Sequence, residues 1–282
     1  MGRSHHLFVP SVTQKKSHVV KFEAFTKKNS DLPFPGKMKV FEAALVSAIL
    51  YGSEAWLSES AIKTATPMYM ACIRSLLGVR KTTASDLCLV ESNLPPLLQR
   101  IKVSQQRCIE KLINERTDIP DDPFMHAMGL ARDANAPCAR YILSLEQFAP
   151  EDTRRQLNER IEQSQRTKYI TYRTLMNPQL SLHEMYTDTS VKEHERLAVT
   201  RLRLSSHNMA IEKGRWARQP RERRICVCGE VQDEPHVLGI CPLTAPVRAK
   251  YPQINFEMPA FFDVEPTQVM TKVCYDLVKN FV

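Results

Sequence analysis

The sequence has no hydrophobic run long enough to cross a membrane. Its most apolar stretch, residues 40–50, includes Glu42, whereas a membrane-spanning helix needs about 20 apolar residues. The first residues, MGRSHHLFVPS, lack the apolar central region of a secretory signal peptide. These two absences predict an intracellular protein, nuclear or cytoplasmic, that has no membrane partner.

Glycine and aromatic residues are also scarce. The 282 residues include 8 glycines against 18 prolines, and only 7% are aromatic, which indicates helices separated by rigid breaks. A hydrophobic content of 43% is sufficient for a core in one or two domains. Without a secretory signal, the 8 cysteines are better interpreted as free thiols in a reducing compartment than as four disulfides.

Apolar residues recur at helical spacing over most of the chain, so the expected fold is mainly α. Thr66 followed by Pro67 predicts a helix that begins there, and Asp122 is expected to cap a helix that begins at Pro123. Ser190 and Glu193 have the spacing of a capping box. Other helices are expected over residues 14–28, 37–51, 97–115, 138–145, 151–176, 247–251 and 268–281.

The most specific pattern in the chain is C-x-C-x7-H-x4-C. Its four members are Cys226, Cys228, His236 and Cys241. Three thiolates and one imidazole form a complete tetrahedral Zn²⁺ site without an open position, so the predicted zinc site is structural. Gly229 suits a tight turn, and Asp233 and Glu234 are candidates to orient the ring of His236. The alternative is that these are ordinary buried cysteines beside a surface histidine.

A basic run precedes this pattern. Residues 196–224 contain nine cations and two acids, a net +7 out of a formal +8 for the whole chain. A concentration of positive charge of this size attracts a polyanion. Arginine favours bidentate contacts with phosphate, and the tryptophan within the run can stack on an unpaired base. The candidate nucleic-acid-binding residues are Arg201, Arg203, Lys213, Arg215, Trp216, Arg218, Arg221, Arg223 and Arg224. The alternatives for this run are a solvated face or a localisation signal. In a separate segment, Arg80 and Lys81 either contact phosphate or lie in a solvated loop.

Three stretches together resemble a known family: KVFEAALVSAILYGSEAWL, SLLGVRKTTASDLCLVESNLPPL and RLRLSSHNMAIEKGRWARQPRERRICVCGEVQDEPHVLGICPL. They resemble the C-terminal part of a LINE-type, non-LTR retrotransposon reverse transcriptase, over residues 17–92 and 196–243. The resemblance implies a thumb-like helical region (1–118), a helical spacer (119–189), and a basic helix, a Cys3His zinc knuckle and a C-terminal helix (190–282). It further implies binding of template RNA or of single-stranded or target DNA.

The chain departs from this family in what it lacks. Polymerase chemistry needs palm carboxylates that hold two metal ions, but no aromatic-x-Asp-Asp motif is present. The palm would precede residue 1, the endonuclease of these elements is absent, and the 41 residues from 242 to 282 are too few for a restriction-like nuclease. The expected protein is therefore a nucleic-acid-binding fragment that is not itself an enzyme.

Two other functions compete with this one. The first is a helical protein-interaction module with a structural zinc site and no nucleic-acid role, whose basic run meets an acidic protein or a transport receptor. The second is a cysteine- or zinc-based hydrolase, which is disfavoured because four protein ligands saturate the metal. The sequence identifies no particular protein partner.

Overall fold

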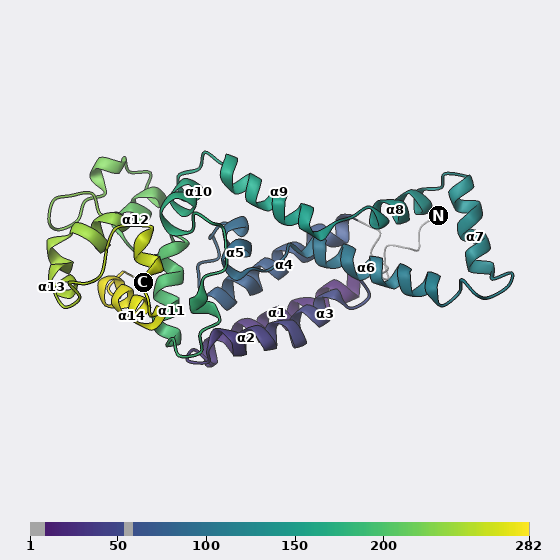
Figure 1. The fold of residues 1–282 in the computed structure, drawn as a ribbon, viewed down its shortest axis with the longest axis horizontal. Coiled ribbons are helices and arrows are strands. Elements are labelled where there is room, and N and C mark those ends of the chain that lie inside the picture. Colours follow the sequence, from purple (N-terminus) through teal and green to yellow (C-terminus); the bar gives the residue numbers. More distant parts are fainter. Residues whose placement is uncertain (1–8, 54–58, 282) are drawn as a thin grey trace.

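The computed structural model describes residues 9–53 and 59–281, and it shows an elongated helical molecule (Figure 1). The expected mainly α fold is confirmed, because the described residues form no β-sheet and only an isolated antiparallel bridge between Ile225 and Val231. Residues 54–57, the end of the first stretch that resembles the retrotransposon proteins, lie outside the described residues. None of the described helices combines the length and apolarity that crossing a bilayer requires.

The first part of the chain forms a bundle in which α1 packs against α4. Its helices are α1 (Val9–Lys28), α2 (Phe34–Val40), α3 (Ser47–Leu50), α4 (Glu59–Leu77) and α5 (Ser85–Ser92). A π-helical turn, η1 (Phe41–Val46), joins α2 to α3, so the helix predicted over residues 37–51 is present. Phe41 is central to the bundle, with its ring centroid 5.7 Å from Phe22 and 5.8 Å from Tyr69.

Two predicted helix starts were wrong. Pro67 lies inside α4, and Thr66 donates its hydroxyl back to the Ile62 carbonyl at 2.8 Å instead of capping. Ala65 and Tyr69, on either side of the proline, are both buried in the same core, and this packing outweighs the cost of an internal proline, about 3 kcal/mol.

The capping box is also absent. Helix α11 (Glu193–Arg203) begins after Lys192 without a side-chain cap. The carboxylate of Glu193 is instead buried in an ion pair, accepting from Lys37 Nζ at 2.7 Å and from Arg196 Nε at 2.8 Å.

The middle of the chain forms an arm that lies on the right of Figure 1. Its helices are α6 (Leu97–Asn114), α7 (Pro123–Asp133), α8 (Pro137–Glu146) and α9 (Pro150–Gln163). Helix α6 begins after Pro96, and Asp122 caps α7 by accepting from the backbone N–H of Phe124 at 2.9 Å, both as predicted. Helix α7 buries none of its residues.

The prediction of one continuous helix over residues 151–176 was wrong. The chain breaks after α9 and continues as α10 (Thr167–Thr171) and a π-helical turn, η3 (Tyr172–Met176). Leu157, Ile161 and Tyr172 are buried, because this segment returns from the arm and packs against α5.

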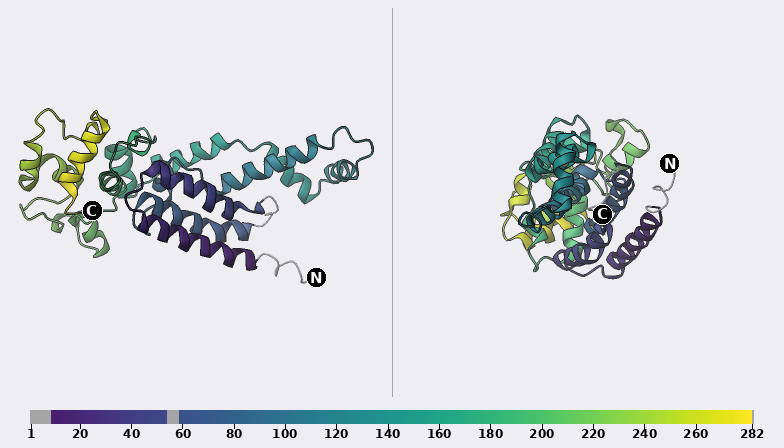
Figure 2. Two further views of the ribbon diagram at one scale, coloured as in Figure 1. Left: turned by 90° about the horizontal axis from the view of Figure 1, so that it is seen from below. Right: turned by 90° about the vertical axis from the view of Figure 1, so that its right-hand side faces the viewer.

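The last third of the chain lies at the end of the molecule opposite the arm (Figure 2). Besides α11, its helices are α12 (Ala210–Trp216), α13 (Ala245–Arg248) and α14 (Thr267–Val278). Shorter turns are η4 (Glu184–Tyr186), η5 (Arg221–Arg223), η6 (His236–Ile240), η7 (Pro242–Thr244) and η8 (Ala260–Asp263). Helix α11 packs along α14, so the C-terminal helix supports the helix that precedes the knuckle.

A buried ion pair connects the regions. Glu91 on α5 accepts from Arg203 on α11 through both oxygens, at 2.7 and 3.2 Å. The hydroxyls of Tyr172 and Tyr186 donate to the same carboxylate at 2.7 and 2.9 Å. Burial raises the pKa of Glu91, but Arg203 and the two hydroxyls outweigh this effect and hold it below its usual range.

The ranges 1–118, 119–189 and 190–282 all contribute side chains to one buried core. Their division into domains stays a prediction.

We expect Arg203→Met to lower the free energy of unfolding by about 3–5 kcal/mol, because it leaves the carboxylate of Glu91 buried without its partner. Urea denaturation of the variant and the wild type measures this loss. Arg132→Met is the control: it removes an exposed pair with Glu146 and should cost less than about 1 kcal/mol. Equal, small losses in both variants contradict the role assigned to Arg203.

Candidate metal centre and cationic surface

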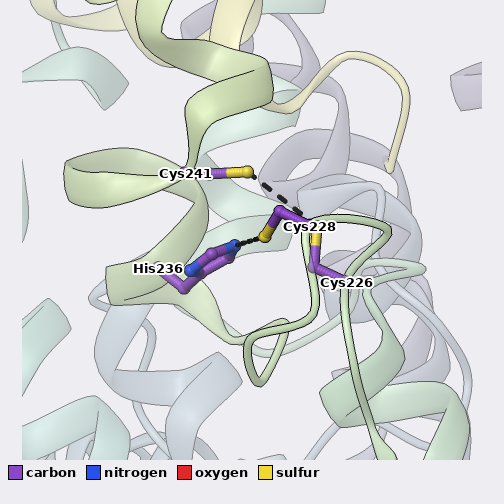
Figure 3. A group of neighbouring side chains, drawn as sticks. All are labelled: Cys226, Cys228, His236 and Cys241. Carbon is purple, nitrogen blue, oxygen red and sulfur yellow. Dashed lines mark hydrogen bonds between the residues drawn. The ribbon is translucent and has the colours of Figure 1, made fainter.

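Cys226, Cys228, His236 and Cys241 converge on one point (Figure 3). Their ligand atoms all lie within 4.8 Å of one another. The sulfurs of Cys226 and Cys241 are 3.8 Å apart, and Cys228 Sγ is 3.2 Å from His236 Nε2. Two thiolates bound at about 2.3 Å to one tetrahedral ion are separated by about 3.8 Å, so the group has the size of a metal site.

A tight turn presents the first two cysteines. The Cys226 N–H donates to the Glu230 carbonyl at 2.7 Å, and the Gly229 N–H donates to the Cys226 carbonyl at 2.9 Å. Gly229 has φ +98°, in the left-handed region where a side chain is unfavourable. The predicted role of Gly229 is therefore confirmed, and the turn places two sulfurs side by side.

The other two ligands lie at the two ends of the π-helical turn η6. His236 begins this turn, and the Cys241 N–H donates to the His236 carbonyl at 2.8 Å. Arg248 on α13 then holds the Cys241 carbonyl at 2.8 Å. The wide π turn brings the imidazole and the sulfur onto one side of the segment, facing the cysteine turn (Figure 3).

The predicted support for the histidine ring was wrong. Asp233 accepts from the backbone N–H of His236 at 3.1 Å and not from the ring. Glu234 is instead 3.0 Å from the buried ring of His207. Nδ1 of His236 is buried and has no hydrogen-bond partner among the described residues, so the two acids hold the segment and not the imidazole.

The surroundings favour a thiolate at Cys226. Burial raises its pKa, but the backbone N–H of Cys228 and the amide of Gln232, 3.5 Å from the sulfur, lower it to about 6. Thiolate is the form that binds metal. Four protein donors leave no coordination position for a substrate, so the arrangement can hold a metal ion in a structural role.

Three arginines of the basic run face inward. Arg203 was wrongly predicted to contact nucleic acid, because its side chain is only 2% exposed and is paired with Glu91. Arg196 is equally buried against Glu193. Arg201 is half-buried and donates from Nε to the Gly78 carbonyl at 2.8 Å.

Two more arginines support local structure. Arg215 pairs with the buried Glu212. Arg224 lies across Gly214, where an added Cβ would be 2.4 Å from Arg224 Cγ, and it donates to the Gln219 carbonyl at 3.0 Å. Gly214 therefore allows this close approach inside α12.

The remaining candidates are on the surface. Lys213, Arg218, Arg221 and Arg223 are exposed, and Arg221 also pairs with Asp233 at 2.5 Å. Trp216 is 54% exposed, and the guanidinium of Arg80 lies 4.2 Å from the centroid of its ring. Sequence reasoning considered Arg80 only as a loop residue; its partner on α12 is 136 positions away, and no local signal indicates this contact.

No protein-family model, curated protein or solved structure matches this chain.

We expect the purified protein to contain one tightly bound metal ion per chain, and Cys228→Ser and Cys241→Ser each to lose most of it, because each removes one of four donors. Metal content after gel filtration measures this. Cys138→Ser, which changes an exposed cysteine on α8, is the control and should keep the metal. Wild-type metal content in the two knuckle variants would show that these cysteines are not ligands.

Proposed function

We propose that this chain is retrotransposon-derived, corresponds to the C-terminal part of a LINE-type reverse transcriptase, and binds nucleic acid. It binds RNA, or single-stranded or target DNA, and a structural Zn²⁺ holds its knuckle. The observation that carries this proposal is the exposed cationic segment that lies between α12 and the metal-ligand group.

Zinc is the metal that the donors fit best. Three thiolates and an imidazole are soft and borderline ligands, and a closed tetrahedral set of this kind is characteristic of Zn²⁺. Cys226, His236 and Cys241 are buried and Cys228 is partly buried, which limits the access of water and suits a structural role.

The cationic segment has the chemistry of a nucleic-acid contact. Arg218, Arg221 and Arg223 follow Trp216 directly and are exposed, so their guanidinium groups are accessible to phosphate oxygens. Trp216 offers an accessible ring for stacking on an unpaired base. Because the metal ligands follow immediately in the chain, the knuckle fixes the end of this segment.

The middle arm supports a second function. Helix α7 buries none of its residues, and Ile119, Leu130 and Leu143 are 50%, 58% and 52% exposed. Exposed apolar residues mark a protein interface where they form one contiguous patch, and α7 and α8 pack against each other. These exposed residues favour the alternative of a helical protein-interaction module with a structural zinc site, in which nucleic acid has no role.

Binding to a single-stranded RNA or DNA 20-mer should weaken with salt. Three of the exposed cations, Lys213, Arg218 and Arg223, remain when Arg221 is counted as neutralised by Asp233. If each neutralises one phosphate, the slope of log K against log salt is at least as steep as about −2.1 for a single strand. Fluorescence anisotropy of the zinc-loaded protein at several salt concentrations measures the slope. Absence of binding at low salt would favour the protein-interaction module.

Trp216→Ala should weaken single-strand binding by about 5-fold to 150-fold, the equivalent of one stacked base. Trp216→Phe keeps an aromatic face and should retain most of the affinity, and the unfolding midpoints of both variants check that the fold is intact. Equal affinities of the alanine variant and the wild type would place the strand away from α12.

A further inference from the structure

A cation-lined hollow lies outside the predicted arginine run. It has a volume of about 500 Å³, within the range of ligand-binding pockets, about 300–1,000 Å³. Three segments form it: the end of α4 with the loop that leads into α5, the start of α10, and α12. Its lining residues are Arg74, Thr82, Thr83, Ala84, Ser85, Arg166, Thr167, Lys168, Tyr169 and Arg215.

Arg74 is fixed in this hollow by the loop that it faces. Its Nε donates to the Thr83 carbonyl at 2.9 Å, and its Nη2 donates to Ser85 Oγ at 2.8 Å. A guanidinium held in place by its neighbours needs little reorganisation when it binds an anion. The hydroxyls of Thr82 and Thr167, which are both exposed, add donors that a phosphate oxygen accepts.

The charge of the hollow is positive after its acids are counted. Lys168 and Arg215 both pair with Glu212, which is buried beneath them. Asp86, beside the hollow, is close to the Tyr169 hydroxyl at 3.3 Å and to Arg160 at 3.4 Å. The four cations of the lining therefore face two carboxylates, and the remaining positive charge favours an anionic ligand.

A second hollow shares Arg74 with the first. It has a volume of about 330 Å³, and its lining includes Lys27, Lys81 and Arg201 against a single acid, Glu23. Its remaining cation, Lys37, is paired with Glu193. Cations therefore lie on both sides of the loop between α4 and α5. Together they offer a strand more than one position for a phosphate group.

The first hollow is also next to the exposed tryptophan. Arg215 lines the hollow, and Trp216 follows it on α12 with Arg80 of the same α4–α5 loop against its ring. A strand with a phosphate in the hollow can therefore place a neighbouring base at Trp216.

We propose that this hollow binds a phosphodiester group of single-stranded nucleic acid and is a phosphate site of the chain. The inference rests on the proposed function and adds a site that the arginine run does not contain. It explains how the N-terminal bundle and the segment ahead of the knuckle contact one strand, because the hollow is built from both.

Two variants test the hollow at exposed positions of its lining. Arg166→Gln removes an exposed cation from the lining. Thr167→Glu adds a negative charge there, at the first residue of α10, where a carboxylate is favourable to the helix. The controls are Arg132→Gln and Thr117→Glu, the same substitutions at exposed sites on the arm. The probes are single-stranded RNA and DNA 20-mers, titrated with the zinc-loaded full chain.

We expect Arg166→Gln to weaken binding about 3-fold and to reduce the salt slope by about 0.7, the contribution of one phosphate contact. Thr167→Glu should weaken binding by about 10-fold because it repels the phosphate, whereas both controls should match the wild type. Equal effects on the RNA and the DNA probe support recognition through phosphate alone.

The outcomes separate the two proposals. If the wild type binds both probes and the two hollow variants bind as tightly as their controls, the hollow is not the phosphate site, while the proposed function stands. If the wild type binds neither probe at low salt, both proposals are overturned.

Discussion

The buried ion pair between Glu91 and Arg203 is the interaction on which the arrangement of this molecule depends. It lies where α5, α11 and the segment returning from the arm meet, and two tyrosine hydroxyls complete the hydrogen bonds of the carboxylate. Either charge alone in this place would be strongly unfavourable. The pair therefore fixes α11 against the N-terminal bundle, and with it the position of α12 and the knuckle that follow.

This constraint divides the arginines into two groups with different tasks. Arg196 and Arg203 are on α11 and neutralise buried acids, whereas Arg218 and Arg223 lie beyond α12 and face solvent. The net charge of the run counts both groups alike, because Glu91 is 112 residues from Arg203 and lies outside the counted window. Charge that is neutralised in the core contributes little to the field that a polyanion meets.

The features that the sequence predicted correctly are those decided by neighbouring residues. The four metal ligands lie within 16 residues and are held by a glycine turn and a π turn between them, so their spacing was sufficient. Pro96 and Asp122 set helix starts through their own backbone and side chain. Pro67, Glu193 and Arg203 were misjudged because packing or a distant charge decides their roles, and the cation-lined hollow was missed because its three segments are far apart in sequence.

The knuckle and the cationic surface are mechanically connected through one glutamine. Gln232 donates to Cys226 Sγ at 3.5 Å, and its own carbonyl oxygens accept from the backbone of α12, at 2.7 Å from Ala210 and 3.1 Å from Ile211. A metal ion that fixes Cys226 therefore also fixes the start of α12, the helix that ends at Trp216. On this geometry the ion need not touch a phosphate to matter for binding. Under the proposed function, the ion would hold the helix that ends between the exposed cations and the hollow, so that the entropy cost of ordering this helix is met when the protein folds and not when a strand binds.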